Sequence, residues 1–159
     1  MSRKSFSFDK QLKVGDEGVS LLISHLTKVG HTVEDLTKGP NAQDRDIDLL
    51  VDGITVEVKS DSHKATNVFL ELTCGNRPGC LFKSRADYWA IVFPKERIYY
   101  WVALPELQWW VSTHMANYKH LVIRSHRNKR LWKATGIAVP ISDLFEAGLN
   151  ITRYALGGE

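Results

Sequence analysis

The chain has 159 residues and a mass of 18.1 kDa, a length that fits one domain of about 100–200 residues. Hydrophobic residues make up 43% and charged residues 25%, which is typical of a globular protein and excludes a largely disordered chain. No stretch approaches the roughly 18 uncharged apolar residues that a membrane span needs. The two cysteines cannot form a disulfide framework, so we expect a protein of the reducing cytoplasm that makes no membrane contact.

The formal charge of +3 is small, but the charges are unevenly distributed along the chain. Acidic residues gather in the first half, whereas no acidic residue stands between Glu106 and Asp143. The basic residues of that interval are Lys119, Arg124, Arg127, Lys129, Arg130 and Lys133. This asymmetry predicts that one part of the chain holds cations and that the other meets a polyanion.

In chain order, an amphipathic stripe of apolar residues predicts a helix from Phe8 to about Val29, closed by Gly30. β-Branched and apolar runs then predict four strands, which are Thr32–Leu36, Asp46–Val51, Ile54–Lys59 and Asn67–Leu72. Residues 37–45 have the composition of a loop. A single helical turn is expected at Ser84–Asp87.

Further along, Tyr88–Phe93 and Ile98–Ala103 predict a second hairpin, and a helix follows from Pro105 to about Asn117. A strand at Lys119–Ile123 and a short helix at Ser142–Ala147, closed by Gly148, complete the pattern. Strands cluster in the middle with helices on either side, so the expected fold is α/β or α+β in a single domain.

The dipeptide Asp52-Gly53 favours a two-residue turn, which fixes the register of the first hairpin. Val51 then faces Ile54, Leu49 faces Val56, Asp48 faces Glu57 and Asp46 faces Lys59. One face carries only apolar side chains, which are those of Ile47, Leu49, Val51, Ile54, Val56 and Val58. The opposite face brings two carboxylates together beside a lysine, with Cβ atoms roughly 4.5–5.5 Å apart.

Like charges that face each other destabilise a sheet, and a divalent cation relieves the repulsion. Mg²⁺ prefers one or two carboxylates together with waters and phosphates. A solvated acidic face with Lys59 in a surface ion pair is the plainer interpretation of the same residues. The β-branched Ile54-Thr55-Val56-Glu57-Val58-Lys59 run favours a central strand, in which half-buried carboxylates need a partner.

Asp48, followed nine residues later by Glu57-Val58-Lys59 and preceded by Glu17 in a predicted helix, resembles the PD-(D/E)xK nuclease superfamily. The resemblance covers residues 15–93, although Ile47 stands where the motif has proline. It implies an α/β fold with a restriction-endonuclease-like core, a mixed central sheet flanked by helices, in one nuclease domain over residues 1–159. The metal-site core would occupy about residues 8–93, and a basic, aromatic-rich second half would occupy about 94–159.

The resemblance also implies roles for individual residues. Asp48, Glu57 and the backbone carbonyl of Val58 would ligate Mg²⁺, for which Mn²⁺ could substitute, and Lys59 would position the attacking water. Glu17 would hold the metal or its water shell from the helix, unless it is an ordinary surface glutamate. Two further residues are candidates for supporting the site: Asp46, and Glu71, which could equally be an edge-strand charge.

Two basic segments are candidates for DNA contacts. Lys83 and Ser84 could meet phosphate at a helix start, with Arg85 beside them, and the alternative is a solvated loop. The run from Arg124 to Lys133 interleaves Arg124, Arg127, Lys129, Arg130 and Lys133 with Trp132, which suits a nucleic-acid backbone. Its alternative is a basic hairpin loop in which Trp132 packs inward.

The sequence therefore predicts a Mg²⁺-dependent DNA endonuclease of a prokaryotic or phage-infected cell, of a homing, restriction or junction-resolving type. A domain this small has little surface for reading a long site, so a homodimer or larger homo-oligomer is expected. A second hypothesis is a non-catalytic DNA-binding module on the same fold. A third is a protein-interaction domain that uses the Trp109-Trp110 helix.

Overall fold

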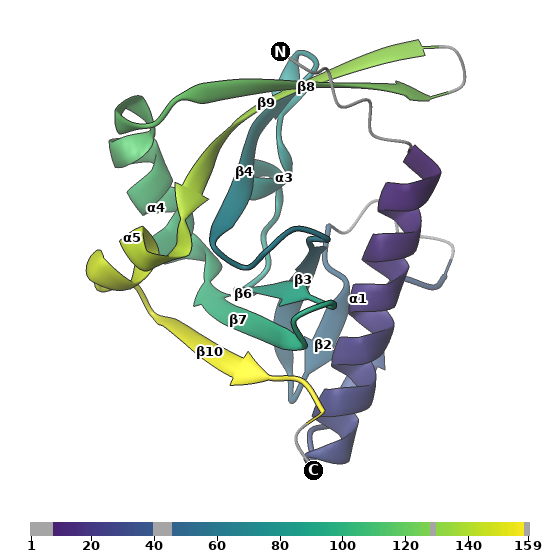
Figure 1. Ribbon diagram of the computed structural model, residues 1–159. Coiled ribbons are helices and arrows are strands. Elements are labelled where there is room, and N and C mark those ends of the chain that lie inside the picture. Colours follow the sequence, from purple (N-terminus) through teal and green to yellow (C-terminus); the bar gives the residue numbers. More distant parts are fainter. Residues whose placement is uncertain (1–7, 40–45, 128–129, 158–159) are drawn as a thin grey trace.

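The computed structural model describes residues 8–39, 46–127 and 130–157, which form two β-sheets and the helices around them (Figure 1). The larger sheet has the order β1-β2-β3-β6-β7-β10. Its strands are β1 Val33–Asp35, β2 Leu49–Val51, β3 Ile54–Ser60, β6 Tyr88–Phe93, β7 Ile98–Ala103 and β10 Ile151–Ala155. Because β3 and β6 run parallel and the other neighbours run antiparallel, this sheet is mixed.

The smaller sheet is antiparallel and has the order β5-β4-β9-β8. Its strands are β4 Asn67–Cys74, β5 Arg77–Pro78, β8 His120–Arg127 and β9 Arg130–Pro140. The helices are α1 Phe8–Lys28, α3 Cys80–Lys83, α4 Leu104–His114 and α5 Ile141–Glu146, with a 3₁₀ turn η1 at Met115–Asn117. The expected α/β class with a mixed sheet flanked by helices is thus confirmed, but the second sheet was not foreseen.

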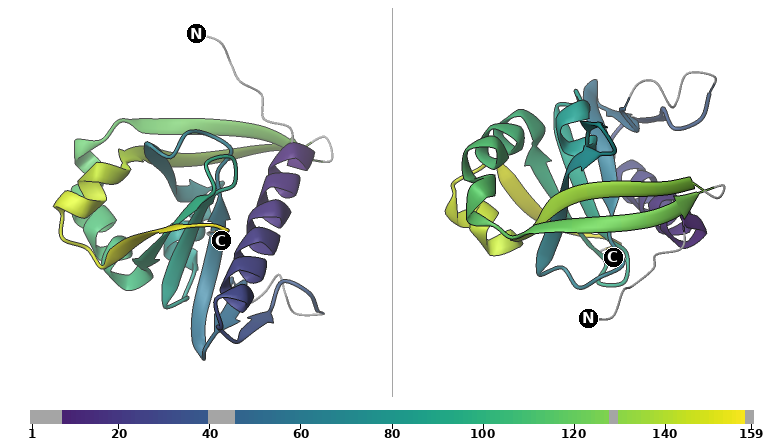
Figure 2. Two further views of the ribbon diagram at one scale, coloured as in Figure 1. Left: turned by 60° about the horizontal axis from the view of Figure 1, so that its bottom comes forward. Right: turned by 90° about the horizontal axis from the view of Figure 1, so that it is seen from above.

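Two hydrophobic clusters lie on opposite faces of the larger sheet. Helix α1 covers one face, where Leu22 and Leu26 pack with Leu49, Val51 and Val56. The other face packs against the smaller sheet, α4 and α5, as the views in Figure 2 show. Burial of these apolar faces is the main stabilising contribution to the fold.

The first hairpin has the register that its turn predicts. Leu49 pairs with Val56, Leu50 with Thr55 and Val51 with Ile54. Asp52 and Gly53 have φ of 48° and 83°, as a type I′ turn requires. Below Leu49 the regular pairing stops, so the predicted strand Asp46–Val51 is too long by three residues.

The irregular segment before β2 changes which way its side chains face. Ile47 packs against the cluster on the far side of the sheet from α1, so its expected place on the α1 face is wrong. The Asp48 N–H donates to the Val56 carbonyl at 2.9 Å, and Asp46 has a left-handed backbone with φ of 49°. Asp46 therefore does not face Lys59 in a ladder pair.

Three other predictions differ from the structure. The helical turn expected at Ser84–Asp87 lies at Cys80–Lys83, and Ser84 is its C-terminal cap with extended backbone. The sequence does not predict strands β5, β9 and β10, and the strand expected at Lys119–Ile123 continues to Arg127 as β8. The second hairpin, β6–β7, and the helix α1 have the predicted bounds within one residue.

Candidate active site

The acidic and basic side chains of β3 lie on the face that points away from α1. In the parallel ladder, Glu57 is beside Trp89 and Lys59 is beside Ile91, and both neighbours belong to the cluster shared with the smaller sheet. The alternate residues Val56 and Val58 contact the α1 cluster instead. Alternation along one strand therefore directs Glu57 and Lys59 to the space between the two sheets.

Asp48 is held by backbone groups of the neighbouring strand. The Val58 N–H donates to Asp48 Oδ2 at 2.7 Å, and the Asp48 carbonyl accepts from the Leu36 N–H at 2.8 Å. Burial raises the pKa of Asp48, and the Val58 hydrogen bond opposes that rise. The side chain is thus fixed at one oxygen while its burial makes the charged form costly.

Glu57 carries the strongest electrostatic perturbation at this site. Burial, assisted by the neighbouring carboxylates of Asp48 and Asp46, raises the pKa of Glu57 to about 8. Its Oε2 atom is buried and has no hydrogen-bond partner. A buried carboxylate oxygen without a partner is costly, and Glu57 is protonated at neutral pH unless a cation compensates its charge.

Lys59 stands beside this acid pair. Its Nζ lies 5.7 Å from the centroid of the Trp89 ring, within the range of a cation–π contact. Burial raises the pKa of both Glu57 and Cys80, and the positive charge of Lys59 opposes that rise in each case. The structure therefore brings together Asp48, Glu57 and Lys59, the three residues that the motif singles out.

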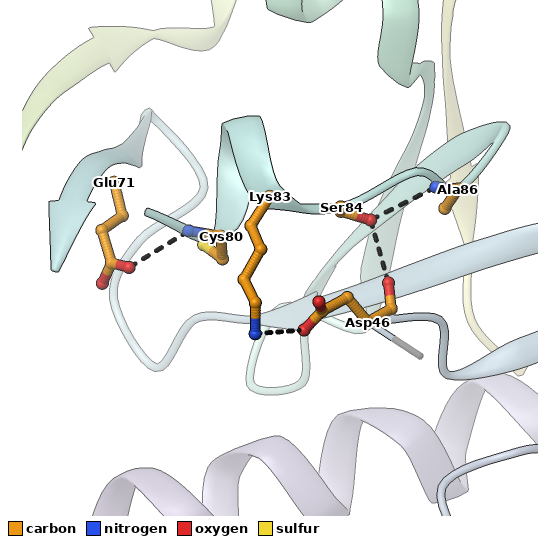
Figure 3. A network of polar contacts seen from close by, with 6 residues as sticks. All are labelled: Asp46, Glu71, Cys80, Lys83, Ser84 and Ala86. Carbon is orange, nitrogen blue, oxygen red and sulfur yellow. Dashed lines mark hydrogen bonds and ion pairs between the residues drawn. The ribbon is translucent and has the colours of Figure 1, made fainter. Parts of the chain in front are cut away.

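The segment before Asp48 is joined to α3 by two contacts (Figure 3). Lys83 Nζ donates to Asp46 Oδ1 at 3.0 Å, and the Ser84 hydroxyl donates to the Asp46 carbonyl at 3.0 Å. Ser84 is only 3% exposed. The helix start expected at Ser84 is wrong, because Lys83 and Ser84 lie at the C-terminal end of α3. A phosphate contact of the exposed Lys83 and Arg85 stays a prediction, whereas Ser84 is buried.

Glu71 approaches the site from the smaller sheet. Its Oε1 accepts from the Cys80 N–H at 3.2 Å, so Glu71 fixes the start of α3 (Figure 3). Burial raises the pKa of the Cys80 thiol, on which Lys59, Glu71 and Glu57 all act electrostatically. Cys80 is a neighbour of the site that the sequence did not reveal, because nothing in its spacing links it to Glu57.

Glu17 is not brought to the acid pair. It is exposed on α1, which packs on the opposite face of the sheet, and its neighbour Gly18 lies against Ser60 at the end of β3. The charges that act on the pKa of Glu57 are those of Asp48, Asp46, Lys59 and Lys83. The role of Glu17 in metal binding stays a prediction, as does that of the Val58 carbonyl.

The basic run of the second half lies in the β8–β9 hairpin of the smaller sheet, whose far end reaches toward the start of α1 (Figures 1 and 2). Arg124 and Lys133 are a cross-strand pair, and both are exposed, as is Arg130. Trp132 is 44% exposed, so its inward packing is excluded. Lys129 and the side chain of Arg127 lie outside the described residues, and Arg85 is exposed beside Ser84.

The described residues contain neither a ready-made metal cluster nor a membrane-spanning helix. They contain no group of three or more His, Cys, Asp and Glu side chains arranged to hold a metal ion. Among the helices of residues 8–39, 46–127 and 130–157, none is long and apolar enough to cross a membrane. Asp48 and Glu57 are two carboxylates that could hold a cation here, a number that suits Mg²⁺.

Comparisons with known proteins give little independent guidance. No protein-family model matches the sequence, and no curated protein matches it. A solved structure of a bacterial homing endonuclease, I-Ssp6803I, is similar with a TM-score of 0.45 and 19% identity, over 58% of this chain and 68% of that chain. Since this likeness is too low to equate the folds, we base the functional proposal on the residues of this chain.

Proposed function

We propose that this protein is a divalent-metal-dependent DNA endonuclease of the PD-(D/E)xK type, which hydrolyses phosphodiester bonds with Mg²⁺ or, in its place, Mn²⁺. The observation that carries the proposal is the buried, unpartnered Oε2 of Glu57 beside Asp48 and two residues before Lys59. Ion pairs with a purely structural role also perturb pKa values. In such pairs, however, the buried carboxylate oxygen has a partner, whereas Glu57 Oε2 has none.

The donor set fits a hard divalent cation. Asp48 uses Oδ2 to accept from Val58, and Glu57 has one oxygen without a partner. Positive charge at this position would offset the burial of both carboxylates and the repulsion from neighbouring acids, which raise the two pKa values. Glu57 would lose its proton on becoming a ligand, so cation binding would strengthen with rising pH.

The cation and the two lysines near it would have different chemical roles. A bound Mg²⁺ would act as a Lewis acid toward the phosphodiester. Lys59, held near the Trp89 ring, would donate hydrogen bonds that orient the attacking water and would balance negative charge developing at phosphorus. Lys83, whose exposed amine is paired with Asp46, would supply a further positive charge at the rim.

The β8–β9 hairpin would bind the DNA backbone. Its exposed Arg124, Arg130 and Lys133 supply charge complementary to phosphate, and exposed Trp132 supplies an aromatic surface. One chain carries one acid pair, so cutting both strands of a duplex would require two copies, and we propose a homodimer or larger homo-oligomer.

The test is cleavage of supercoiled plasmid, linear duplex and a four-way junction, each with and without Mg²⁺. The wild-type protein should cleave only with Mg²⁺, and Asp48→Asn and Lys59→Ala should each abolish cleavage while the circular dichroism spectrum is unchanged. Asp16→Asn and Lys38→Ala, at exposed positions of the same residue types, are the matched controls. Full cleavage by either Asp48→Asn or Lys59→Ala would remove the proposal.

A second candidate is a DNA-binding module on the same fold that does not cleave. The exposed Arg124, Arg130 and Lys133 of the β8–β9 hairpin support this candidate without any role for the acid pair. It predicts salt-dependent DNA binding through the β8–β9 hairpin and no strand breakage with Mg²⁺ or Mn²⁺.

A further inference from the structure

Helix α3 connects the smaller sheet to the segment that carries Asp48. At its start the Cys80 N–H donates to Glu71 of β4, and Gly79 approaches Glu71 so closely that an added Cβ would lie 2.5 Å from the Glu71 carbonyl oxygen. At its end Ser84 donates to the carbonyl of Asp46. The turn is thus fastened on both sides, as Figure 3 shows.

The Ser84 hydroxyl both donates and accepts a hydrogen bond. The Oγ donates to the Asp46 carbonyl at 3.0 Å and accepts from the Ala86 N–H at 3.3 Å. Among the side chains that the structure describes, Ser84 is the one buried polar or charged residue. A buried hydroxyl with these partners fixes the position of the backbone that it contacts.

The backbone that Ser84 holds is in an unfavourable conformation. Asp46 has φ of 49°, a left-handed value that is uncommon outside glycine, although aspartate adopts it more readily than most residues. Two residues later, Asp48 is placed by the Val58 N–H and by its own N–H to Val56. A change at Asp46 would therefore shift the carboxylate of Asp48.

Helix α4 in turn fixes the end of α3. The Gln108 amide Nε2 donates to the Leu81 carbonyl at 2.8 Å and to the Ser84 carbonyl at 3.0 Å, and Leu81 is fully buried. A continuous series of contacts therefore runs from Gln108 through Ser84 and Asp46 to Asp48.

We infer that Ser84 is a positioning residue, supported by Gln108, which holds the Asp46–Asp48 backbone so that Asp48 can ligate the cation. The inference rests on the proposed function, because Asp48 is a ligand only there. Ser84 does not touch substrate or cation, and it acts through the backbone. Groups that orient metal ligands from behind typically affect metal affinity by about 10–100-fold.

The experiment compares Ser84→Ala and Gln108→Leu with the wild-type protein. Ser112→Ala is the matched control, since the Ser112 hydroxyl is exposed and bonds only within α4, to the Trp109 carbonyl. Hydrogen exchange of the Val58 amide is followed by NMR in metal-free protein, and Mn²⁺ affinity is measured by titration calorimetry. Cleavage is then measured as a function of Mn²⁺ concentration.

We expect Ser84→Ala to accelerate exchange of the Val58 amide and to weaken Mn²⁺ binding by about tenfold, with cleavage recovering toward the wild-type rate at saturating Mn²⁺. Gln108→Leu should act in the same direction, and it serves alone if Ser84→Ala fails to fold. Unchanged Mn²⁺ affinity or unchanged Val58 exchange in a folded variant would overturn the inference. Failure of the proposed function would appear differently, as absence of Mn²⁺ binding by the wild-type protein.

Discussion

Replacing Glu57 by glutamine removes the most perturbed carboxyl of the site and should change how stability depends on pH. In the folded protein the pKa of Glu57 is raised from 4.5 to about 8. Between these values the folded state binds one proton more than the unfolded state, so the free energy of unfolding falls as pH rises. The contribution of Glu57 to the free energy of unfolding is therefore highest below pH 4.5 and reaches its lower limit above about pH 8.

The size of this effect follows from the linkage relation. Each pKa unit corresponds to about 1.4 kcal/mol, so the ionisation of Glu57 costs the metal-free folded state on the order of 4–5 kcal/mol across this window. Domains of this size are stable by only about 5–15 kcal/mol. The loss should therefore be large and easily measured.

The assay is urea unfolding in EDTA from pH 5 to pH 9, for the wild-type protein and for Glu57→Gln. The wild-type protein should lose more stability than the variant as pH rises, and the variant should be the more stable protein at pH 9. His25, whose pKa is lowered by burial, contributes a slope of opposite sign near pH 6, but it cancels in the comparison. Parallel stability curves for the two proteins would refute the reasoning.

Three further predictions follow from the same structure. Mg²⁺ at pH 8 should raise the melting temperature of the wild-type protein but not that of Glu57→Gln, and equal shifts in thermal unfolding would place the cation elsewhere. Arg124→Glu and Lys133→Glu should each weaken DNA binding and reduce the magnitude of the slope of log K against log salt by about 1. Lys38→Glu is the control. A wild-type slope in the two hairpin variants would exclude the hairpin from the interface. Gly18→Ala should destabilise the fold by about 1–3 kcal/mol in urea unfolding, because the new Cβ would lie 2.8 Å from Ser60 Cβ. A stabilised Gly18→Ala protein would mean that α1 is not packed tightly on β3.

The local signals in the sequence were sufficient for the first hairpin. Asp52-Gly53 imposes a turn of known geometry, and the apolar alternation of β3 then determines which side chains share a face. For that reason Glu57 and Lys59 could be assigned correctly to one face. The register predicted from the turn does not hold below Leu49, because contacts with Lys83 and Ser84, and not strand pairing, determine the backbone conformation of Asp46.

The elements that the sequence did not predict are those whose conformation depends on distant partners. Strand β9 contains Gly136, which permits Phe69 of β4 to pack directly over the backbone, and no local pattern indicates that need. Strand β10 is a largely exposed edge strand, so it lacks the apolar alternation by which a strand is recognised. The basic neighbours of Ser84 indicate an exposed phosphate contact, but its burial arises from contacts with α4 and the Asp46 segment.

The most direct test of the central claim is to soak crystals of the wild-type protein and of Glu57→Gln with Mn²⁺ and to compute anomalous difference maps. If Asp48 and Glu57 hold the cation, the wild-type map will contain a peak in contact with both carboxylates, and the peak will be absent or much weaker in the variant. A wild-type map without a peak at these two side chains, under conditions in which the protein cleaves DNA with Mn²⁺, would contradict the account.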